Sequence, residues 1–146
     1  FSVEWGDLDI LLLDLPPGTG DVQLTLTQMA PLTGAVIVTT SSPLALEDVG
    51  RGVQMFRQTD VPILGLIENM STFTCDSCGS ESHPFGHGGG ASAASALDIP
   101  FLGEIPLDPS LRSGADDGTP AFISQPQSPA SQAMRGISRG LLGRLA

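Results

Sequence analysis

Short apolar runs alternate with amphipathic segments along this chain. Near-continuous apolar runs predict strands that are buried on both faces, at Leu8 to Asp14, Ala35 to Thr40, Ile63 to Glu68 and Phe101 to Ile105. Helical spacing or helix-start signals predict helices at Val22 to Met29, Leu44 to Thr59, Ala91 to Leu97, Pro109 to Asp117 and from about Ala130. Because strands that alternate with helices are typical of a parallel sheet with flanking helices, we predict an α/β fold.

The interval between the third and fourth predicted strands departs from this alternation. It contains both cysteines, both histidines and a Gly88-Gly89-Gly90 run, which indicates an elaborated functional loop. With 146 residues, of which 40% are hydrophobic, the chain is long enough for one globular domain with a core. We therefore expect a single domain over 1–146, with a cysteine-bearing metal loop at 70–90, a linker at 124–129 and a C-terminal helix at 130–146.

The first predicted strand ends on Asp14 and continues into Leu-Pro-Pro-Gly-Thr-Gly-Asp21. A carboxylate at the end of a buried strand can hold Mg²⁺ through water, and Gly18 and Gly20 let backbone N–H groups approach phosphate oxygens. The pattern resembles a Walker B strand followed by a switch loop, and a strand-end cap is the alternative role for Asp14. We expect Asp21 to be the N-cap of the next helix.

All six Lys and Arg residues of the chain are arginine, so the chain contains no lysine. The lysine of a Walker A loop, which grips the β- and γ-phosphates of a nucleotide, is therefore not in this sequence. The sequence also begins at Phe1 and leads at once into a predicted strand, which we interpret as a fragment or a cleaved product. We expect this chain alone to be unable to hydrolyse ATP.

Cys75-Asp-Ser-Cys78 places two thiols at a spacing that lets both sulfurs ligate one metal ion or one cluster edge. A four-coordinate site needs two further ligands. Either His83 and His87 complete a zinc knuckle, which would make the chain a zinc-stabilised interaction module, or a second copy of the chain supplies two more cysteines. A thioredoxin-like dithiol and a pair of ordinary reduced thiols are the remaining alternatives.

The overall charge and the cysteine content exclude several classes of protein. A formal charge of -10 and a pI near 4.2 argue against non-specific nucleic-acid binding, because the phosphates would be repelled. The apolar runs are too short for a transmembrane helix. Two cysteines are too few for a secreted disulfide scaffold and indicate a reducing compartment, so we expect a cytoplasmic protein.

Several motifs follow one another in a fixed order over most of the chain. They are Asp14-Leu-Pro-Pro-Gly-Thr-Gly-Asp21, Pro31-Leu-Thr-Gly-Ala-Val, Glu68-Asn-Met-Ser71, Cys75-x-x-Cys78-Gly, Phe85-Gly-His-Gly-Gly-Gly90 and Leu102-Gly-Glu-Ile-Pro-Leu-Asp108. This set resembles the Mrp/ApbC-type iron-sulfur cluster carriers, which are P-loop ATPases with a deviant Walker A loop in the MinD-like branch. The resemblance implies a SIMIBI-like P-loop NTPase fold whose N-terminal P-loop strand and helix are not in this chain.

The resemblance also implies an activity and a set of site residues. It implies a homodimeric ATPase that uses ATP and Mg²⁺, binds a labile [4Fe-4S] cluster between its subunits and passes the cluster to apo iron-sulfur proteins. Asp14 would take the catalytic Walker B role, and the switch loop would consist of Pro16, Pro17, Gly18, Thr19 and Gly20. Asn69 and Pro106 match positions beside the adenine base, and Cys75 and Cys78 match the cluster ligands.

The predicted C-terminal helix supports a different class of function. Met134, Ile137, Leu141 and Leu145 fall on one of its faces, with arginines around them. A membrane-surface helix of a MinD/ParA-like positioning ATPase has such a pattern. A helix that packs on the sheet has the same pattern, because four apolar positions and three charges are ordinary for it. We favour packing on the sheet and expect no membrane partner.

Overall fold

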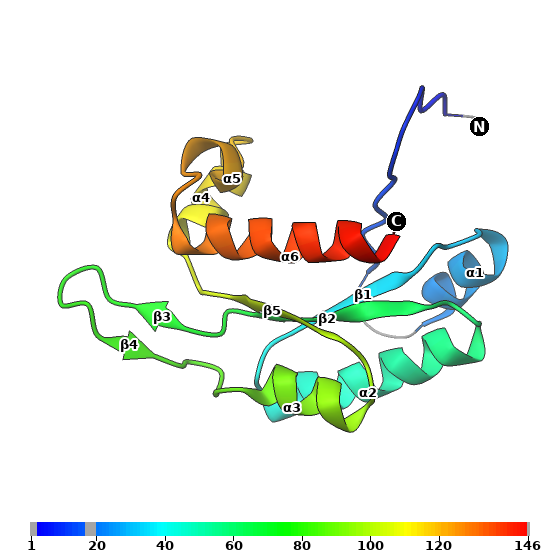
Figure 1. Cartoon of the computed structure of the whole chain (residues 1–146), viewed down its shortest axis with the longest axis horizontal. Helices are drawn as coiled ribbons and strands as arrows, with labels where there is room; N and C mark the ends of the chain where they lie inside the picture. The colour runs from blue at the N-terminus through cyan, green and yellow to red at the C-terminus, as the bar shows by residue number, and fades with distance from the viewer. Residues whose placement is uncertain (1–2, 17–19, 146) are drawn as a thin grey trace.

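The computed structural model describes residues 3–16 and 20–145. Its centre is a parallel sheet in the order β1-β2-β5, formed by β1 (Ala35–Thr39), β2 (Ile63–Asn69) and β5 (Phe101–Ile105). The helices are α1 (Asp21–Met29), α2 (Pro43–Gln58), α3 (Gly89–Ala96), α4 (Pro109–Asp116), α5 (Ala121–Ser124) and α6 (Pro129–Leu145). In Figure 1, α2 and α3 lie on one face of the sheet and α6 lies on the other, which confirms the predicted α/β class.

The helix bounds agree with the sequence prediction to within two residues, and only the short helix α5 is unforeseen. Helix α2 begins as expected, because the Ser42 hydroxyl accepts a hydrogen bond from the Ala45 N–H at 3.3 Å and Pro43 fills the first helical position. The N-cap prediction for Asp21 is wrong, because Gly20 is the N-cap and Asp21 is the first helical residue. Its carboxylate still lies at the positive end of the helix dipole.

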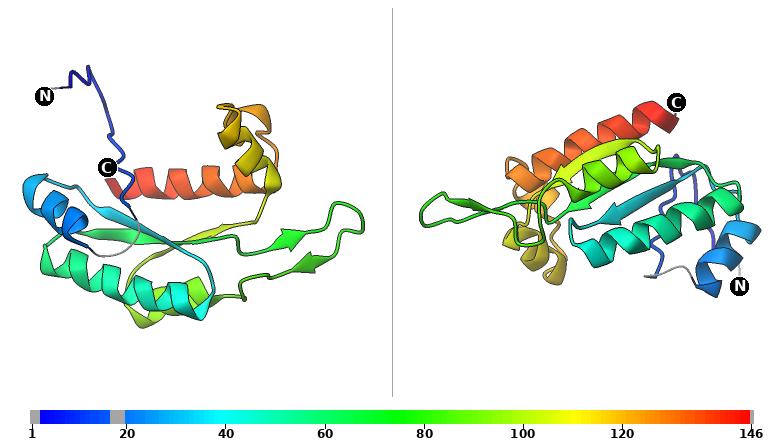
Figure 2. Two further views of the ribbon diagram at one scale, coloured as in Figure 1. Left: turned by 180° about the vertical axis from the view of Figure 1, so that it is seen from behind. Right: turned by 90° about the horizontal axis from the view of Figure 1, so that it is seen from below.

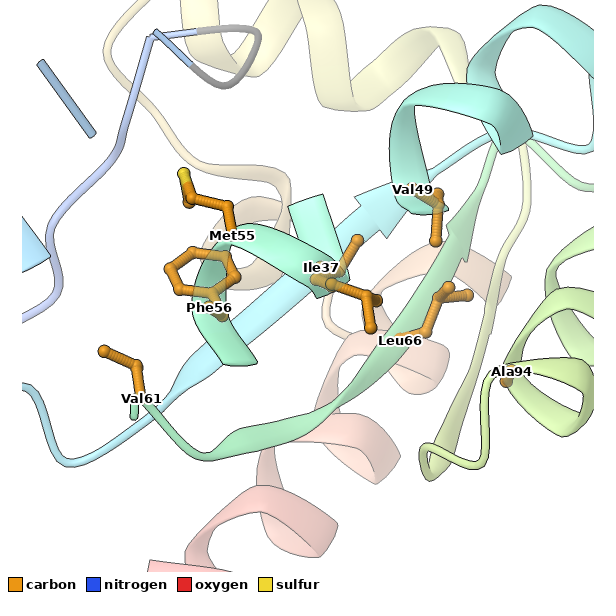
Figure 3. Close-up of a cluster of buried hydrophobic side chains, with 8 residues drawn as sticks. Ile37, Val49, Met55, Phe56, Val61, Leu66 and Ala94 are labelled. Atoms are coloured by element: carbon orange, nitrogen blue, oxygen red, sulfur yellow. The ribbon is translucent and has the colours of Figure 1, made fainter. Parts of the chain in front are cut away.

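The main core lies between the sheet and the face formed by α2 and α3. It gathers Ile37 from β1, Leu66 from β2, Val49, Val53, Met55 and Phe56 from α2, Val61 and Ala94 (Figure 3). Leu66 and Val53 are completely buried. The helical spacing of the apolar residues of α2 therefore turns one face of that helix onto the sheet.

Helix α6 closes the opposite face of the sheet. Ile67 of β2 and Ile105 of β5 pack against Ile137 of α6, and Met134 and Leu141 flank this contact. The prediction that this helix packs on the sheet is confirmed, and three of the four residues of its apolar face contact the sheet side, whereas Leu145 is 38% exposed. Across the described residues, no helix has both the length and the apolar content needed to cross a bilayer.

The predicted strand from Leu8 to Asp14 is wrong for this structure. The segment forms no regular secondary structure and is solvent-exposed, with Leu12 88% exposed. In Figures 1 and 2 the blue segment runs outside the sheet. A strand needs a neighbour to share its hydrogen bonds, and within residues 3–16 and 20–145 no strand pairs with this segment. An apolar run alone is thus not sufficient for a buried strand.

A short hairpin fills part of the predicted loop at 70–90. It consists of β3 (Phe73–Thr74) and β4 (Glu81–Ser82), which pair antiparallel and extend past the end of the main sheet (Figure 2). The residues that lead into β3 are fastened to the end of β5 and to the chain that follows it. The Ser71 N–H donates to the carbonyl of Ile105 at 3.1 Å, and the Leu107 N–H donates to the carbonyl of Thr72 at 2.8 Å.

Candidate functional site

The carboxyl ends of the three parallel strands form one edge of the sheet. β1 ends at Thr39, β2 ends at Asn69 and β5 ends at Ile105, so Asn69 and Pro106 lie at the same edge. Ligands of open α/β sheets bind beyond this edge. The Asn69 side chain is half-buried, and its amide oxygen accepts a hydrogen bond from the Met70 N–H at 2.9 Å. Among residues 3–16 and 20–145 its amide NH₂ group donates no hydrogen bond, so it is available as a donor at the edge.

A cleft of about 620 Å³ runs along β1 and is lined by residues of β1, by α2, by the segment before α1 and by Asn69. Leu15 and Pro16 form part of its wall. The buried Gln23 side chain holds this segment in place by donating a hydrogen bond to the carbonyl of Pro16 at 2.7 Å. The structure thus brings two of the sequence-predicted nucleotide residues, Pro16 and Asn69, to one cleft.

The other residues of the predicted switch region are not gathered at this cleft. Asp14 and Gly20 are exposed, and neither belongs to the cleft wall formed by the described residues. Pro17, Gly18 and Thr19 lie outside the described residues. Asp14 therefore does not lie at the cleft, where a ligand of a nucleotide-bound Mg²⁺ ion would be needed.

The two cysteines lie at the tip of the β3–β4 hairpin. The Cys75 N–H donates to the carbonyl of Ser80 at 3.0 Å, and the Gly79 N–H donates to the carbonyl of Cys75 at 2.8 Å. Gly79 adopts a φ of 70°, a left-handed conformation that glycine takes without strain. The turn leaves Cys75 half-buried and Cys78 exposed, both as free thiols.

The surroundings of Cys78 favour its thiolate. The Ser80 hydroxyl lies 3.1 Å from the Cys78 sulfur, and this hydrogen bond is the main cause that lowers the pKa of Cys78 below its ordinary value. The Ser80 backbone N–H and the Cys75 thiol lower this pKa further, and slight desolvation opposes them. The thiolate is the form of cysteine that binds metals, so the lowered pKa favours the metal-binding form of Cys78.

The histidines do not join the cysteines in a metal site. The Nδ1 atom of His83 lies 3.0 Å from the carbonyl oxygen of Ser71, so this nitrogen carries the proton and donates it. The His87 ring stacks at a tilt on His83, with 4.4 Å between the ring centroids. Within residues 3–16 and 20–145, no group of three or more His, Cys, Asp or Glu residues is placed to hold a metal ion.

Sequence reasoning missed a buried carboxylate beside the hairpin. Glu68 of β2 is completely buried. It accepts a hydrogen bond from the Ser41 hydroxyl at 2.6 Å and another from the Gly90 N–H at 2.7 Å. One signal was present in the sequence, because Glu68 is the only charged residue in the predicted strand from Ile63 to Glu68.

Comparisons with known proteins point to one family. A family model described as "ParA: NUBPL iron-transfer P-loop NTPase" matches residues 1–142. The iron-sulfur cluster transfer protein NUBPL of Dictyostelium discoideum is 48% identical over 144 residues, which cover 99% of this chain and 45% of that protein. The iron-sulfur cluster carrier protein of Deinococcus radiodurans is 51% identical over 142 residues, which cover 97% of this chain and 40% of that protein.

Solved structures agree with this result. A nucleotide-binding protein of Archaeoglobus fulgidus, solved in complex with ADP, matches with a TM-score of 0.71 and 41% identity over 85% of this chain and 50% of its own. The cell division ATPase MinD of Pyrococcus furiosus matches with a TM-score of 0.59 and 24% identity, over 78% of this chain and 44% of its own, which shows the fold alone. This chain spans half or less of the length of these relatives. The resemblance drawn from the motifs is confirmed, and the chain belongs to the family of NUBPL-type iron-transfer P-loop NTPases.

Proposed function

We propose that this chain holds a labile [4Fe-4S] cluster through Cys75 and Cys78 and passes it to apo iron-sulfur proteins. The observation that carries this proposal is the hairpin tip, which presents two free thiols to solvent and favours the thiolate of one of them. Two thiolates are half of the ligands that such a cluster needs. A homodimer, in which each copy supplies two cysteines, would complete the site.

The exposed position of the thiols suits transfer as well as binding. A cluster held at the tip of a hairpin is open to attack by the thiolates of an acceptor protein, and each new iron-sulfur bond would replace one to Cys75 or Cys78. A cluster in the protein core would not be accessible in this way. The named activity of the Dictyostelium and Deinococcus relatives, transfer and carriage of iron-sulfur clusters, supports this cargo.

We propose that the complete protein is an ATPase, in which a segment preceding this chain provides the phosphate-binding lysine and a strand beside Leu8 to Asp14. That strand would order the exposed apolar run and place Asp14 as the ligand of a Mg²⁺-bound water. Pro16, Pro17, Gly18, Thr19 and Gly20 would then sense the γ-phosphate, and Asn69 and Pro106 would flank adenine at the carboxyl edge of the sheet. The ADP in the archaeal relative supports nucleotide binding.

The same proposal assigns the chain, from residue 1 to residue 146, to one domain of a cytoplasmic protein. The main core and the α6 core share the strands of one sheet, which supports a single unit. Free cysteines, one half-buried and one exposed, suit a reducing compartment. We expect the chain alone to show no ATP hydrolysis, and measurable turnover that Asp14→Ala abolishes would contradict this.

Anaerobic reconstitution with iron and sulfide tests the cluster proposal in the full-length protein. We expect a brown, visible-absorbing species with four iron atoms per dimer that is lost in Cys75→Ser and in Cys78→Ser. His87→Ala is the matched control, because it changes a side chain of a type that can bind metals but lies outside the proposed ligand set, and it should keep the cluster. One tightly bound zinc ion per monomer, lost in His87→Ala, would replace this proposal by the zinc module.

A further inference from the structure

Glu68 is buried without an opposite charge. Its carboxylate is completely inaccessible to solvent, and the ion pairs found among the described residues join Arg51 and Arg112 to other acids. Burial of a charge costs several kcal/mol unless hydrogen bonds compensate it. A buried charged side chain at this position therefore stabilises the core less than an apolar side chain would.

The hydrogen bonds of Glu68 join three separate parts of the chain. One carboxylate oxygen accepts from the Ser41 hydroxyl, which belongs to the loop after β1, and the other accepts from the Gly90 N–H at the start of α3. Ser41 in turn accepts a hydrogen bond from the Gly89 N–H at 2.9 Å. The positive end of the α3 dipole also faces the carboxylate. We call Ser41, Glu68, Gly89 and Gly90 the carboxylate clasp.

The clasp explains two glycines of the Gly88-Gly89-Gly90 run. A Cβ atom at Gly90 would lie 2.8 Å from the Glu68 carboxylate, and one at Gly89 would lie 3.1 Å from the Ser41 backbone. Only glycine lets the start of α3 approach both groups so closely. These two glycines therefore allow the start of α3 to pack against Ser41 and Glu68.

The carboxylate clasp lies between the two halves of the proposed site. Ser41 belongs to the loop at the carboxyl end of β1, and Glu68 directly precedes Asn69, so both are at the edge where nucleotide would bind. Gly89 and Gly90 lie where the chain returns from the cysteine hairpin into α3. The start of the hairpin is held through Ser71, whose N–H and hydroxyl donate to the carbonyl of Ile105. A shift of the loop after β1 at the nucleotide edge would thus reach the returning arm of the hairpin through Glu68 and the start of α3.

We infer that Glu68 is a positioning residue that couples nucleotide binding at the sheet edge to the position of the cysteine hairpin. This inference rests on the proposed function. Its consequence is that nucleotide changes the exposure of Cys75 and Cys78, and that this change passes through the hydrogen bonds of Glu68. Coupling between two sites in proteins typically amounts to about fivefold or more in a measured constant.

The test measures how fast iodoacetamide alkylates Cys75 and Cys78 in the metal-free, full-length protein, with and without Mg-ATP. We expect ATP to change this rate by about fivefold or more in the unchanged protein. Glu68→Leu should reduce the change to less than about twofold while ATP still binds, because it removes both hydrogen bonds. Glu68→Gln should restore the change, since its amide can accept from Gly90 and donate to Ser41.

Glu104→Leu is the matched control, because Glu104 lies opposite Glu68 in the β2–β5 ladder but is exposed, and it should keep the full change. The inference is overturned if Glu68→Leu keeps the change, if Glu104→Leu loses it as well, or if ATP binds to the unchanged protein without any change. Should Glu68→Leu not fold, Ser41→Ala removes one link and must weaken the change. Failure of the proposed function appears separately, as no cluster on reconstitution or no ATP binding.

Discussion

Gly90→Ala tests how tightly the start of α3 packs on the sheet. The added methyl group would lie 2.8 Å from a carboxylate oxygen of Glu68, 2.9 Å from its Cβ and 3.2 Å from Leu66. Both neighbours are completely buried, so neither side chain can swing into solvent to make room. Accommodation therefore requires α3 or β2 to move.

The expected cost of Gly90→Ala follows from three terms. Overpacking of a dense core costs about 1–3 kcal/mol. Loss of the 2.7 Å hydrogen bond from the Gly90 N–H to the Glu68 carboxylate adds about 1.5–3 kcal/mol if the helix moves away. The gain in helix propensity from alanine returns at most about 1 kcal/mol. We expect the free energy of unfolding to fall by about 2–4 kcal/mol, taking partial relaxation into account.

Urea unfolding followed by circular dichroism measures this change, with Gly140→Ala as the matched control. Gly140 lies in α6, and a Cβ atom there would meet no atom within 4 Å. That variant should gain about 0.5–1 kcal/mol from helix propensity alone. If Gly90→Ala were as stable as Gly140→Ala, the close contact between α3 and Glu68 would be refuted.

Leu66→Ala should lower the free energy of unfolding by about 2–5 kcal/mol, because Leu66 is completely buried. In this chain on its own, Leu12→Ala, at an 88% exposed side chain, should change it by less than about 0.5 kcal/mol, and equal losses in urea unfolding would contradict this core. Ser80→Ala should raise the pKa of Cys78, because the Ser80 hydroxyl is the main cause that lowers it. In the metal-free variant, the rate of cysteine alkylation should then increase at a higher pH than in the unchanged protein. An unshifted pH profile would exclude the Ser80 hydroxyl as the cause of the lowered pKa. Ser42→Ala should cost about 1 kcal/mol in a thermal melt by removing the N-cap of α2, and an unchanged Tm would show that the cap is dispensable.

The sequence predicted those elements whose partners are also in this chain. The runs at 35–40, 63–68 and 101–105 became neighbouring strands, because each one finds another strand of the set beside it. The apolar faces of α2 and α6 pack on the two faces of that sheet. The run from Leu8 to Asp14 carries an equally strong pattern but has no neighbour within the described residues, so it stays exposed. The hydrophobic pattern of a segment shows which of its faces is apolar. Whether that segment forms a strand also depends on another strand being beside it to share hydrogen bonds.

The site was predictable to a lesser degree. Cys75 and Cys78 stand out through their spacing, and Asn69 through its place after a strand, so their approximate locations followed from the pattern. The hairpin of β3 and β4 did not, because its strands are too short to show an alternation. Glu68 was missed for another reason. Its partners Ser41 and Gly90 lie 27 and 22 residues away in the chain, and no local pattern records such contacts.

The contacts at the base of the cysteine hairpin, more than the hairpin itself, determine where the thiols lie. β3 and β4 contribute two residue pairs, and a hairpin of that size is marginally stable in water. Its starting end is fixed by the hydrogen bonds of Ser71 to the carbonyl of Ile105, and its returning end is fixed by Glu68 and by the His83 ring on Ser71. In the proposed homodimer, a firm base with a short, exposed tip would let two copies bring their thiols together in a defined direction. In the proposed transfer, the same short tip would yield to an acceptor protein, because few contacts beyond the base would have to break.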